Sequence, residues 1–565
     1  MATPADAHAQ HNIAHLLTAH AGSPRVLYSH FENEMWNDYT ADATMALAGA
    51  WQAALTRSGV GEGDRVALCM KNSVHWVAID MATLGLGAVV VPLYVDDNAE
   101  NIAYCTAHSG AKLLIVDALR QANALSATKI AAEQPLPRIV CMQAKAGDAF
   151  ESAQHFLDNA SARFQVKPVV TEQLATICYT SGTSGKPKGV MLSHANILAN
   201  VRQCRGAGIA TPEMIFLSLL PLSHMFERTG GYYLPLSLGA RVIYTRGIAQ
   251  LADDLKQQPV TTMFVAPRVL ERLHARIVQG LKEQGKMDLF NRLADAAWRR
   301  QRGEGSLLDR LTVLVLQPLM GKKIRVKIAP TLSLLVSGGA ALSSAVARTF
   351  VAIGLPVLQG YGMTEASPVL TVNRPERNDP ESVGPALPEI ELVIADDGEL
   401  LARGPNVMLG YWNNPEATAK VVDTQGWLHT GDLASMHLGR YTIKGRKKDI
   451  LVMSNGEKFS PQDAELAILG DPSFEQLMLI GEGKPFLTLA CVTQSTDSKD
   501  LIKRANAQLA SFPRWVKVRQ IIATPEAWTV DSGLLTPTLK VKRAAVLEKF
   551  KSQIEALYDE REGEA

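Results

Sequence analysis

Short apolar runs alternate with longer amphipathic stretches over the first half of the chain. Three of these runs lie at 65–69, 88–92 and 113–117. Runs of this length are typical of buried strands, and the stretches between them have helical spacing, so we expect parallel α/β sheets. The longest apolar run, 81–95, is broken by Pro92 and two glycines. It is therefore predicted to be a buried helix that leads into a strand rather than a membrane span.

The pattern of apolar positions changes twice further along the chain. Short alternating runs at 390–394 and 399–403, with Gly and Pro turns around them, predict antiparallel strands and so a third layer. After Gly445 the chain returns to short strands and helices, which predict a small α+β unit. The first helix of this unit is expected to begin with Pro461 and to be capped in a box-like arrangement by Ser460.

Composition narrows the range of functions. A chain of 565 residues, 47% of them hydrophobic, is too long for one core, so we expect at least two globular domains. The 57 Lys and Arg residues balance 56 acidic residues, so no broad positive surface for nucleic acid is expected. Six scattered cysteines without a CxxC pair argue against a zinc ribbon or a disulfide framework and indicate a reducing, cytoplasmic compartment. Residues 1–20 lack the pattern of a secretory signal.

The segment 179–189 has the composition of a phosphate-binding loop. It contains three glycines, four aliphatic hydroxyls and two lysines. Small residues let backbone N–H groups converge on an anion, hydroxyls add donors or a metal ligand, and lysines add charge. The spacing excludes a Walker A loop, because Gly182 lies three residues before Gly185 and Pro187 stands where that motif has Ser or Thr. A solvated Ser/Gly turn is the alternative interpretation.

The flanks of this loop predict a strand–loop–strand unit. Residues 174–179 and 190–192 have the apolar character of buried strands. Ser193 then stands at the N-cap of a predicted helix. The loop is therefore expected to join two strands.

Two later motifs also follow predicted strands. In 336–342 a pair of glycines would let the backbone approach a flat ring closely, although alone they fit an ordinary tight turn. In 359–365 an aromatic ring, a hydroxyl and a carboxylate stand at the carboxyl end of a strand, where ligands bind in open α/β sheets. Glu365 in isolation would be a surface charge, but beside a phosphate loop a carboxylate is a natural Mg²⁺ ligand.

The phosphate loop resembles that of the adenylate-forming superfamily, which includes acyl-CoA synthetases, luciferases and peptide-synthetase adenylation domains. The resemblance extends from about Asn12 to Phe550. It implies an α/β fold in which a large N-terminal domain, residues 1–444, combines stacked, mostly parallel α/β sheets with a distorted antiparallel β-barrel. A hinge would join it to a small, mobile C-terminal α+β domain, residues 445–565. ATP and Mg²⁺ are the implied cofactors, and coenzyme A is the implied co-substrate.

The resemblance also assigns the nucleotide site. Thr180 and Glu365 would hold Mg²⁺, and Asp432 would accept hydrogen bonds from both ribose hydroxyls with help from Arg446. Lys448 stands at the hinge position of the family. The full set of implied nucleotide-binding residues is Thr180, Ser181, Gly182, Thr183, Ser184, Gly185, Lys188, Gly338, Gly339, Ala340, Gln359, Gly360, Tyr361, Gly362, Thr364, Asp432, Arg446 and Lys448.

Two further motifs indicate the reaction and the branch of the superfamily. Lys540 stands in a segment that resembles the C-terminal loop whose lysine drives adenylation, although a lysine near a chain end is otherwise a solvated charge. The segment 220–228, with its His-Met-Phe-Glu-Arg run, resembles long-chain fatty acyl-CoA synthetases, and 230–236 would supply an apolar acyl pocket. His224 could instead be a core histidine. The implied catalytic residues are Lys540, Glu365, Thr180 and His224.

The expected enzyme activates a fatty acid as acyl-adenylate, releases pyrophosphate and transfers the acyl group to coenzyme A. A ligase for acyl carrier protein, a fatty acyl-AMP ligase and a nucleotide or acyl sensor without turnover are the alternatives. The basic and apolar stretch 298–327 could form a peripheral contact with anionic membrane, or could be a helical insert packed on the large domain. The motifs do not indicate the acyl chain length or the oligomeric state.

Overall fold

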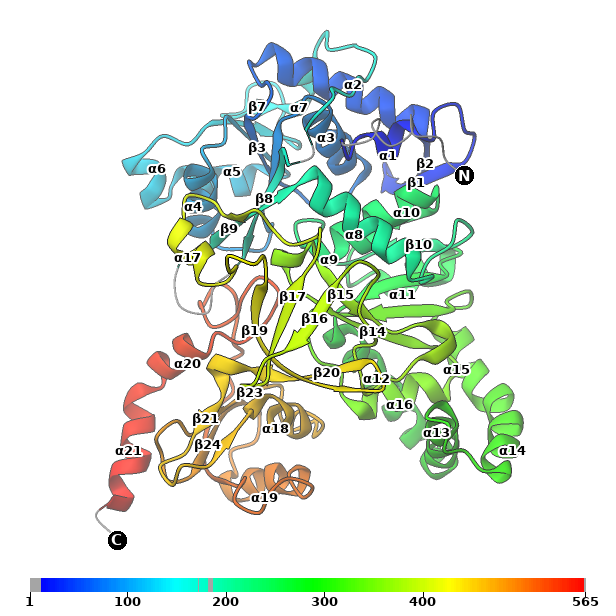
Figure 1. Ribbon diagram of the computed structural model, residues 1–565, viewed down its shortest axis with the longest axis vertical. Helices are drawn as coiled ribbons and strands as arrows, with labels where there is room; N and C mark the ends of the chain where they lie inside the picture. Colours follow the sequence, from blue (N-terminus) through cyan, green and yellow to red (C-terminus); the bar gives the residue numbers. More distant parts are fainter. Residues whose placement is uncertain (1–11, 171, 181–185, 563–565) are drawn as a thin grey trace.

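The computed structural model describes residues 12–170, 172–180 and 186–562 (Figure 1). The large domain is built on two eight-stranded sheets. In the first sheet, the strands from β8 to β7 run parallel, and β9 and β18 add an antiparallel edge. Its order is β18 (Gly410–Tyr411), β9 (Lys188–Ser193), β8 (Leu174–Thr180), β4 (Val89–Pro92), β3 (Arg65–Cys69), β5 (Leu113–Val116), β6 (Arg138–Cys141) and β7 (Glu151–Ser152).

The second sheet is parallel in its centre and antiparallel at both edges. Its order is β15 (Val369–Val372), β14 (Val357–Gly362), β13 (Leu334–Ser337), β12 (Thr262–Val265), β10 (Ile215–Ser218), β11 (Arg241–Tyr244), β1 (Val26–Glu32) and β2 (Met35–Thr40). One apolar core contains side chains from both eight-stranded sheets and from the helices between them. The expectation of stacked, mostly parallel sheets is confirmed.

Helices cover these two sheets and connect their strands. The first group is α1 (His15–Thr18), α2 (Ala41–Arg57), α3 (Val74–Gly85), α4 (Ala99–Ser109), α5 (Leu119–Ser126), α6 (Lys129–Glu133), α7 (Ala153–Leu157) and α8 (His194–Gly206). The second group is α9 (Met225–Glu227), the π-helix η2 (Arg228–Tyr233), α10 (Leu234–Leu238), α11 (Leu251–Gln257), α12 (Pro267–Glu283), α13 (Met287–Gln301), α14 (Leu307–Leu316), the π-helix η3 (Gln317–Gly321), α15 (Lys322–Ile328) and α16 (Ser344–Ala352).

The predicted third layer is a four-stranded antiparallel sheet. Its order is β16 (Glu391–Ile394), β17 (Glu399–Arg403), β19 (Leu428–His437) and β20 (Arg440–Arg446). The short elements around it are the 3-10 helices η4 (Thr364–Ala366) and η5 (Pro375–Arg377) and the helix α17 (Pro415–Ala419). In Figure 1 this layer lies between the large sheets and the C-terminal domain.

The C-terminal domain follows the 3-10 helix η6 (Lys447–Asp449) and has its own apolar cores. Its strands are β21 (Leu451–Val452), β22 (Lys458–Phe459), β23 (Gln476–Ile480), β24 (Leu487–Val492) and β25 (Val518–Thr524). Its helices are α18 (Pro461–Ile468), α19 (Ser498–Gln508), α20 (Arg543–Lys549) and α21 (Lys551–Glu562). The small α+β unit expected from the sequence is confirmed.

Local predictions around the phosphate loop are confirmed, and one helix cap is not. Ser193 forms a complete capping box with Asn196 at the start of α8. Pro461 occupies the first turn of α18 as expected, but the Ser460 side chain makes no capping bond there. The Ser460 hydroxyl lies instead against Gly445, where an added Cβ would be 2.1 Å from it. Tertiary packing of this hydroxyl therefore replaces the predicted local cap.

The run at 81–95 is buried, as expected, with α3 followed by β4. Among the helices that the structure describes, none combines the length and the apolar character needed to span a bilayer.

Candidate active site

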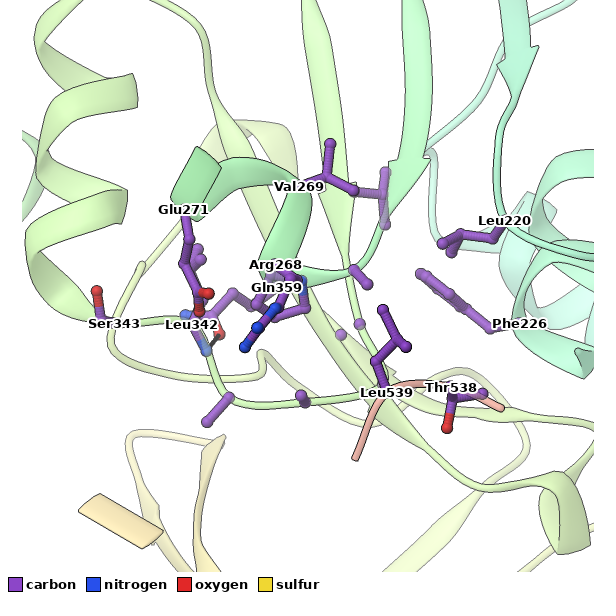
Figure 2. A pocket seen from close by; sticks show the side chains of 18 of the residues that line it. Leu220, Phe226, Arg268, Val269, Glu271, Leu342, Ser343, Gln359, Thr538 and Leu539 are labelled. Carbon is purple, nitrogen blue, oxygen red and sulfur yellow. Dashed lines mark hydrogen bonds between the residues drawn. The ribbon is translucent and has the colours of Figure 1, made fainter. Parts of the chain in front are cut away.

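A cavity of about 3340 Å³ is lined by both large sheets, the antiparallel sheet and the C-terminal domain. Figure 2 shows Thr538 and Leu539 of the C-terminal loop in this cavity together with Phe226 and Gln359 of the large domain. Every predicted site residue within the described ranges lines it. Those residues are Thr180, Lys188, His224, Gly338, Gly339, Ala340, Gln359, Gly360, Tyr361, Gly362, Thr364, Glu365, Asp432, Arg446, Lys448 and Lys540. The predicted loop residues Ser181, Gly182, Thr183, Ser184 and Gly185 lie outside the described residues.

The predicted ribose site is a carboxylate fixed between two strands. Asp432 and Arg446 face each other across β19 and β20, and the Arg446 Nε lies 3.2 Å from the Asp432 Oδ1. The Tyr361 hydroxyl, at the end of β14, donates to the Asp432 Oδ2 at 2.6 Å. Burial, and then the charge of Asp432, raise the pKa of Tyr361, so this phenol stays a donor. Because a carboxylate has about four acceptor positions, Asp432 can still accept two ribose hydroxyls.

Hydrogen bonds within the protein also fix the side chains at the predicted metal end of the cavity. Glu365 lies on η4, is nearly buried, and accepts a 2.8 Å hydrogen bond from the Tyr411 hydroxyl at its Oε1. The Lys188 Nζ stands 5.0 Å from the centre of the Tyr411 ring. Thr180, on the other side of the loop, contacts the Lys188 carbonyl at 3.5 Å. Lys188, at one end of the phosphate loop, therefore lies beside the tyrosine that holds the predicted Mg²⁺ carboxylate.

This donor set fits Mg²⁺ in the form used by nucleotide enzymes. Among the described residues no cluster of three or more His, Cys, Asp or Glu side chains could hold a metal. Mg²⁺ commonly takes only one or two protein ligands and fills its other positions with phosphate and water. Glu365, with one oxygen fixed by Tyr411, can present the other oxygen to the ion.

Two glycine motifs of the sequence come together around Gln359. The Gln359 side chain donates to the Pro380 carbonyl and accepts from the backbone N–H of Leu342 at 3.4 Å. It thereby joins the strand end at β14 to the 336–342 segment. Gly339 has a φ of +81°, which few other residues adopt. The segment predicted to form the adenine wall is therefore held to the end of β14 by the Gln359 amide.

Lys540 reaches the cavity from a tight loop of the C-terminal domain. The Thr536 backbone N–H donates to the Lys540 carbonyl at 2.8 Å, and the Lys540 N–H donates to the Thr536 hydroxyl at 3.0 Å. The Lys540 side chain is exposed to the cavity, but dense protein around the cavity lowers its pKa. The charge of Arg446 lowers it further, and that of Asp432 opposes the shift. The lysine therefore shares one electrostatic environment with Asp432 and Arg446 of the predicted ribose site.

His224 lines the same cavity rather than a closed core. Burial, and then the positive charge of Lys540, lower the pKa of His224 to about 4, so it is neutral at neutral pH. Its Nδ1 accepts the backbone N–H of Phe226 at 3.2 Å at the N-terminus of α9. The neutral ring consequently carries its proton on Nε2.

Two aromatic rings and two glycines form a wall between the nucleotide motifs and the predicted acyl pocket. Phe226 and Phe264 meet edge to face with ring centres 5.4 Å apart. A Cβ on Gly338 would lie 2.9 Å from the Phe226 ring, and a Cβ on Gly230 would lie 2.4 Å from the Phe264 ring. The absence of a side chain at each glycine therefore makes room for one of the two rings.

We expect Gly338→Ala to weaken adenylation while the protein stays folded, because the new methyl must displace Phe226 or the adenine wall. The value of kcat/KM for the fatty acid, measured by pyrophosphate release, should fall about tenfold. Gly61→Ala is the matched control, since its nearest neighbouring atom is 3.9 Å away. An unchanged kcat/KM in Gly338→Ala would contradict a close-packed wall.

A buried ion pair near this wall was missed by the sequence interpretation. Arg228, the last residue of the His-Met-Phe-Glu-Arg run, pairs with Asp80 of α3, and both side chains are fully buried. Arg228 also donates to the Thr176 hydroxyl of β8 at 2.8 Å, and Tyr233 donates to Asp80 at 2.9 Å. Burial raises the pKa of Asp80, and the charge of Arg228 opposes that shift.

This network connects η2 to the strand that leads into the phosphate loop. An aspartate within the apolar helix 74–85 was the available signal in the sequence, but its partner lies 148 positions away. Tyr411, the partner of Glu365, was missed for the same reason, since the two are 46 positions apart.

The family of the chain is identified by comparison with known proteins. A model for AMP-binding enzymes matches residues 19–412, and a model for the C-terminal domain of AMP-binding enzymes matches residues 448–562. The long-chain-fatty-acid–CoA ligase FadD15 of Mycobacterium bovis is 30% identical, covering 94% of each chain. Human long-chain-fatty-acid–CoA ligase 1 is 30% identical over 87% of this chain and 78% of its own length.

Solved structures support the same fold. ATP-bound MatB from Rhodopseudomonas palustris superposes with a TM-score of 0.74 at 22% identity and covers 96% of this chain and 99% of its own. The A domain of carboxylic acid reductase from Segniliparus rugosus gives a TM-score of 0.78 at 17% identity, covering 98% of this chain and 96% of its own. The chain therefore belongs to the AMP-binding enzyme family.

Proposed function

We propose that this enzyme is an ATP- and Mg²⁺-dependent long-chain fatty acid–CoA ligase. The observation that carries the proposal is the convergence of Lys540, Asp432 and Glu365 on one cavity that also has an apolar aromatic wall. The ligases that match over most of this chain are named for long-chain fatty acids. A nucleotide site joined to apolar space suits a substrate with one carboxylate and a long hydrocarbon chain.

In the first half-reaction, a carboxylate oxygen of the fatty acid attacks the α-phosphorus of ATP and pyrophosphate leaves. The ammonium of Lys540 neutralises the negative charge that develops between the carboxylate and the α-phosphate. Asp432 holds the ribose, and Lys188 faces the phosphates. Thr180 and Glu365 would hold Mg²⁺, which offsets the charge of the phosphates. The neutral His224 supplies an N–H donor at the boundary between acyl and nucleotide space.

In the second half-reaction, the thiol of coenzyme A displaces AMP from the acyl-adenylate. We propose that residues 1–444 and 445–565 act as two bodies and that the chain rotates at Lys448 between the steps. Lys540 stands in the cavity in the present arrangement, which suits adenylation. Rotation would withdraw this lysine and admit the thiol.

The alternative acceptors and the sensor hypothesis make different predictions for the same assay. Pyrophosphate release should be screened with acetate, medium-chain, long-chain and aryl acids, and the products should then be tested with coenzyme A and with acyl carrier protein. We expect release with long-chain acids and thioester formation with coenzyme A. Thioester on carrier protein alone, or acyl-adenylate as the end product, would replace the proposed acceptor. If no acid releases pyrophosphate, the result would support the sensor hypothesis.

We also propose that the enzyme works in the cytoplasm with peripheral access to a membrane. The six cysteines are all unpaired and buried, as suits a reducing compartment. Long-chain fatty acids partition into lipid, so an enzyme that consumes them gains from contact with the bilayer surface.

A further inference from the structure

An exposed apolar face runs along the helical segment formed by α14, η3 and α15. These three elements follow one another without a break from Leu307 to Ile328. Large apolar side chains that would normally be buried face outward at helical spacing. They are Leu307, Leu308, Leu311, Leu314, Val315, Leu319 and Val326, with exposed fractions between 42% and 77%. Contiguous apolar exposure of this kind marks a surface that binds something.

The segment is firmly attached to the large domain, so its outward face is not a misplaced core face. The Gln317 amide donates to the carbonyls of Val351 and Ala352, at the end of α16. The Arg325 guanidinium donates to the carbonyl of Gly354 at 2.9 Å. Gly321 packs so closely that an added Cβ would lie 2.7 Å from the Ala352 oxygen. The inner face of the segment is therefore packed and hydrogen-bonded to the large domain, and the leucines of the outer face remain exposed.

The charges around this face are positive. Arg310, Lys322, Lys323 and Lys327 are exposed along the segment. The acidic residue within it, Asp309, is buried and is paired with Arg299. Basic side chains that flank a leucine-rich helical face are characteristic of helices that lie in the interface of anionic membranes. Charge complementarity therefore favours an anionic lipid surface as the occupant.

The catalytic cavity reaches the surface at the same segment. Leu316, Leu319, Met320, Lys323, Ile324, Lys327 and Ile328 of this segment line the cavity that contains Lys540 and Asp432. The facing wall includes Leu255 of α11 and Ile277 and Leu281 of α12. Leu319 and Lys323 are both exposed and part of the lining, so the cavity opens beside the apolar face.

We propose that the exposed face of α14, η3 and α15 docks on an anionic phospholipid bilayer and that the fatty acid enters the cavity there. The identity of the substrate rests on the proposed function, whereas the docking on lipid does not. The apolar side chains would lie in the lipid interface, with the lysines at the level of the phosphates. A fatty acid could then move from lipid into the part of the cavity between α11, α12 and α15, where Leu255, Ile277 and Leu281 would contact its chain.

Vesicle flotation tests the docking without any catalysis. The wild-type protein should float with phosphatidylcholine–phosphatidylglycerol vesicles and far less with pure phosphatidylcholine. The double variant Leu311→Glu/Leu314→Glu should reduce partitioning by at least about tenfold, because two charges would enter the lipid interface. Met35→Glu/Val170→Glu is the matched control, since those side chains are equally exposed elsewhere on the protein. Arg310→Gln/Lys322→Gln should weaken partitioning about fivefold for each charge removed.

Activity then separates this proposal from the proposed function. Neither Leu311 nor Leu314 lines the cavity, so pyrophosphate release from a water-soluble fatty acid should be unchanged in the double variant. Release from long-chain acid carried in the anionic vesicles should fall with the loss of binding. Equal flotation of wild type and double variant, or none of the wild type, overturns the docking proposal. A wild-type dimer in light scattering that the double variant abolishes would also overturn it and would assign the face to a second copy.

Discussion

Lys540→Ala should lose about two orders of magnitude or more in pyrophosphate release while it still converts supplied acyl-adenylate and coenzyme A to thioester. The expected loss is comparable to the removal of one oxyanion donor, because in the proposed mechanism Lys540 stabilises charge that exists only while the carboxylate attacks ATP. The side chain enters the cavity from the tight loop at Thr536, so its truncation removes no core volume. The two half-reactions should be measured separately, by pyrophosphate release and by thioester formation.

Lys542→Ala is the matched control for this variant. Lys542 lies two positions further along, and its side chain does not line the cavity. Its variant should keep both half-reactions. If Lys540→Ala instead damages adenylation and thioester formation equally, either the role of the lysine or the rotation of the C-terminal domain is wrong for this enzyme.

Glu365→Gln should abolish adenylation without unfolding the protein. The substitution preserves shape and keeps an acceptor for the Tyr411 hydroxyl, but it removes the charge that would hold Mg²⁺. We expect a loss of several kcal/mol in transition-state stabilisation, more than the roughly 1.5–3 kcal/mol of one charge-assisted hydrogen bond. Pyrophosphate release as a function of Mg²⁺ concentration is the measurement, since the variant should require far more Mg²⁺ for any residual activity.

Two further variants serve as controls for Glu365→Gln. Glu376→Gln changes an exposed carboxylate on η5 that does not line the cavity, and should have no effect. Tyr411→Phe removes only the partner of Glu365 and should have a smaller effect than Glu365→Gln. Activity of Glu365→Gln within about tenfold of wild type, or roughly 1.4 kcal/mol of barrier, would reject the metal assignment.

The convergence of the candidate site residues on one cavity could be anticipated in large part, because these residues stand in short motifs with local structural causes. The apolar run before Thr180 predicts β8, and Ser193 predicts the start of α8 through its own capping box. The alternation at 399–403 gives β17 with the expected bounds. Periodicity and capping act within a few residues, so they can be read without knowledge of the fold.

The features that the sequence did not predict depend on contacts between segments that are far apart in the chain. The pairing of Asp80 with Arg228 depends on how α3 packs against η2, and no local pattern specifies that packing. Ser460 makes no capping bond, and its hydroxyl packs instead against Gly445 of the distant strand β20. Where a side chain can choose between a local and a distant partner, the sequence alone indicates only the local one.

The short strand β18 has a consequence for the order in which this protein folds during synthesis. Its two residues, Gly410 and Tyr411, pair with β9, which follows the phosphate loop. The ribosome therefore completes every other strand of the first sheet long before that edge can close. Because Tyr411 also holds Glu365, the nascent chain cannot assemble the predicted metal-binding end of the cavity until the segment after β17 has emerged. This edge of the N-terminal sheet therefore closes only after a late part of the chain has been made, although domains in general fold as their own residues appear.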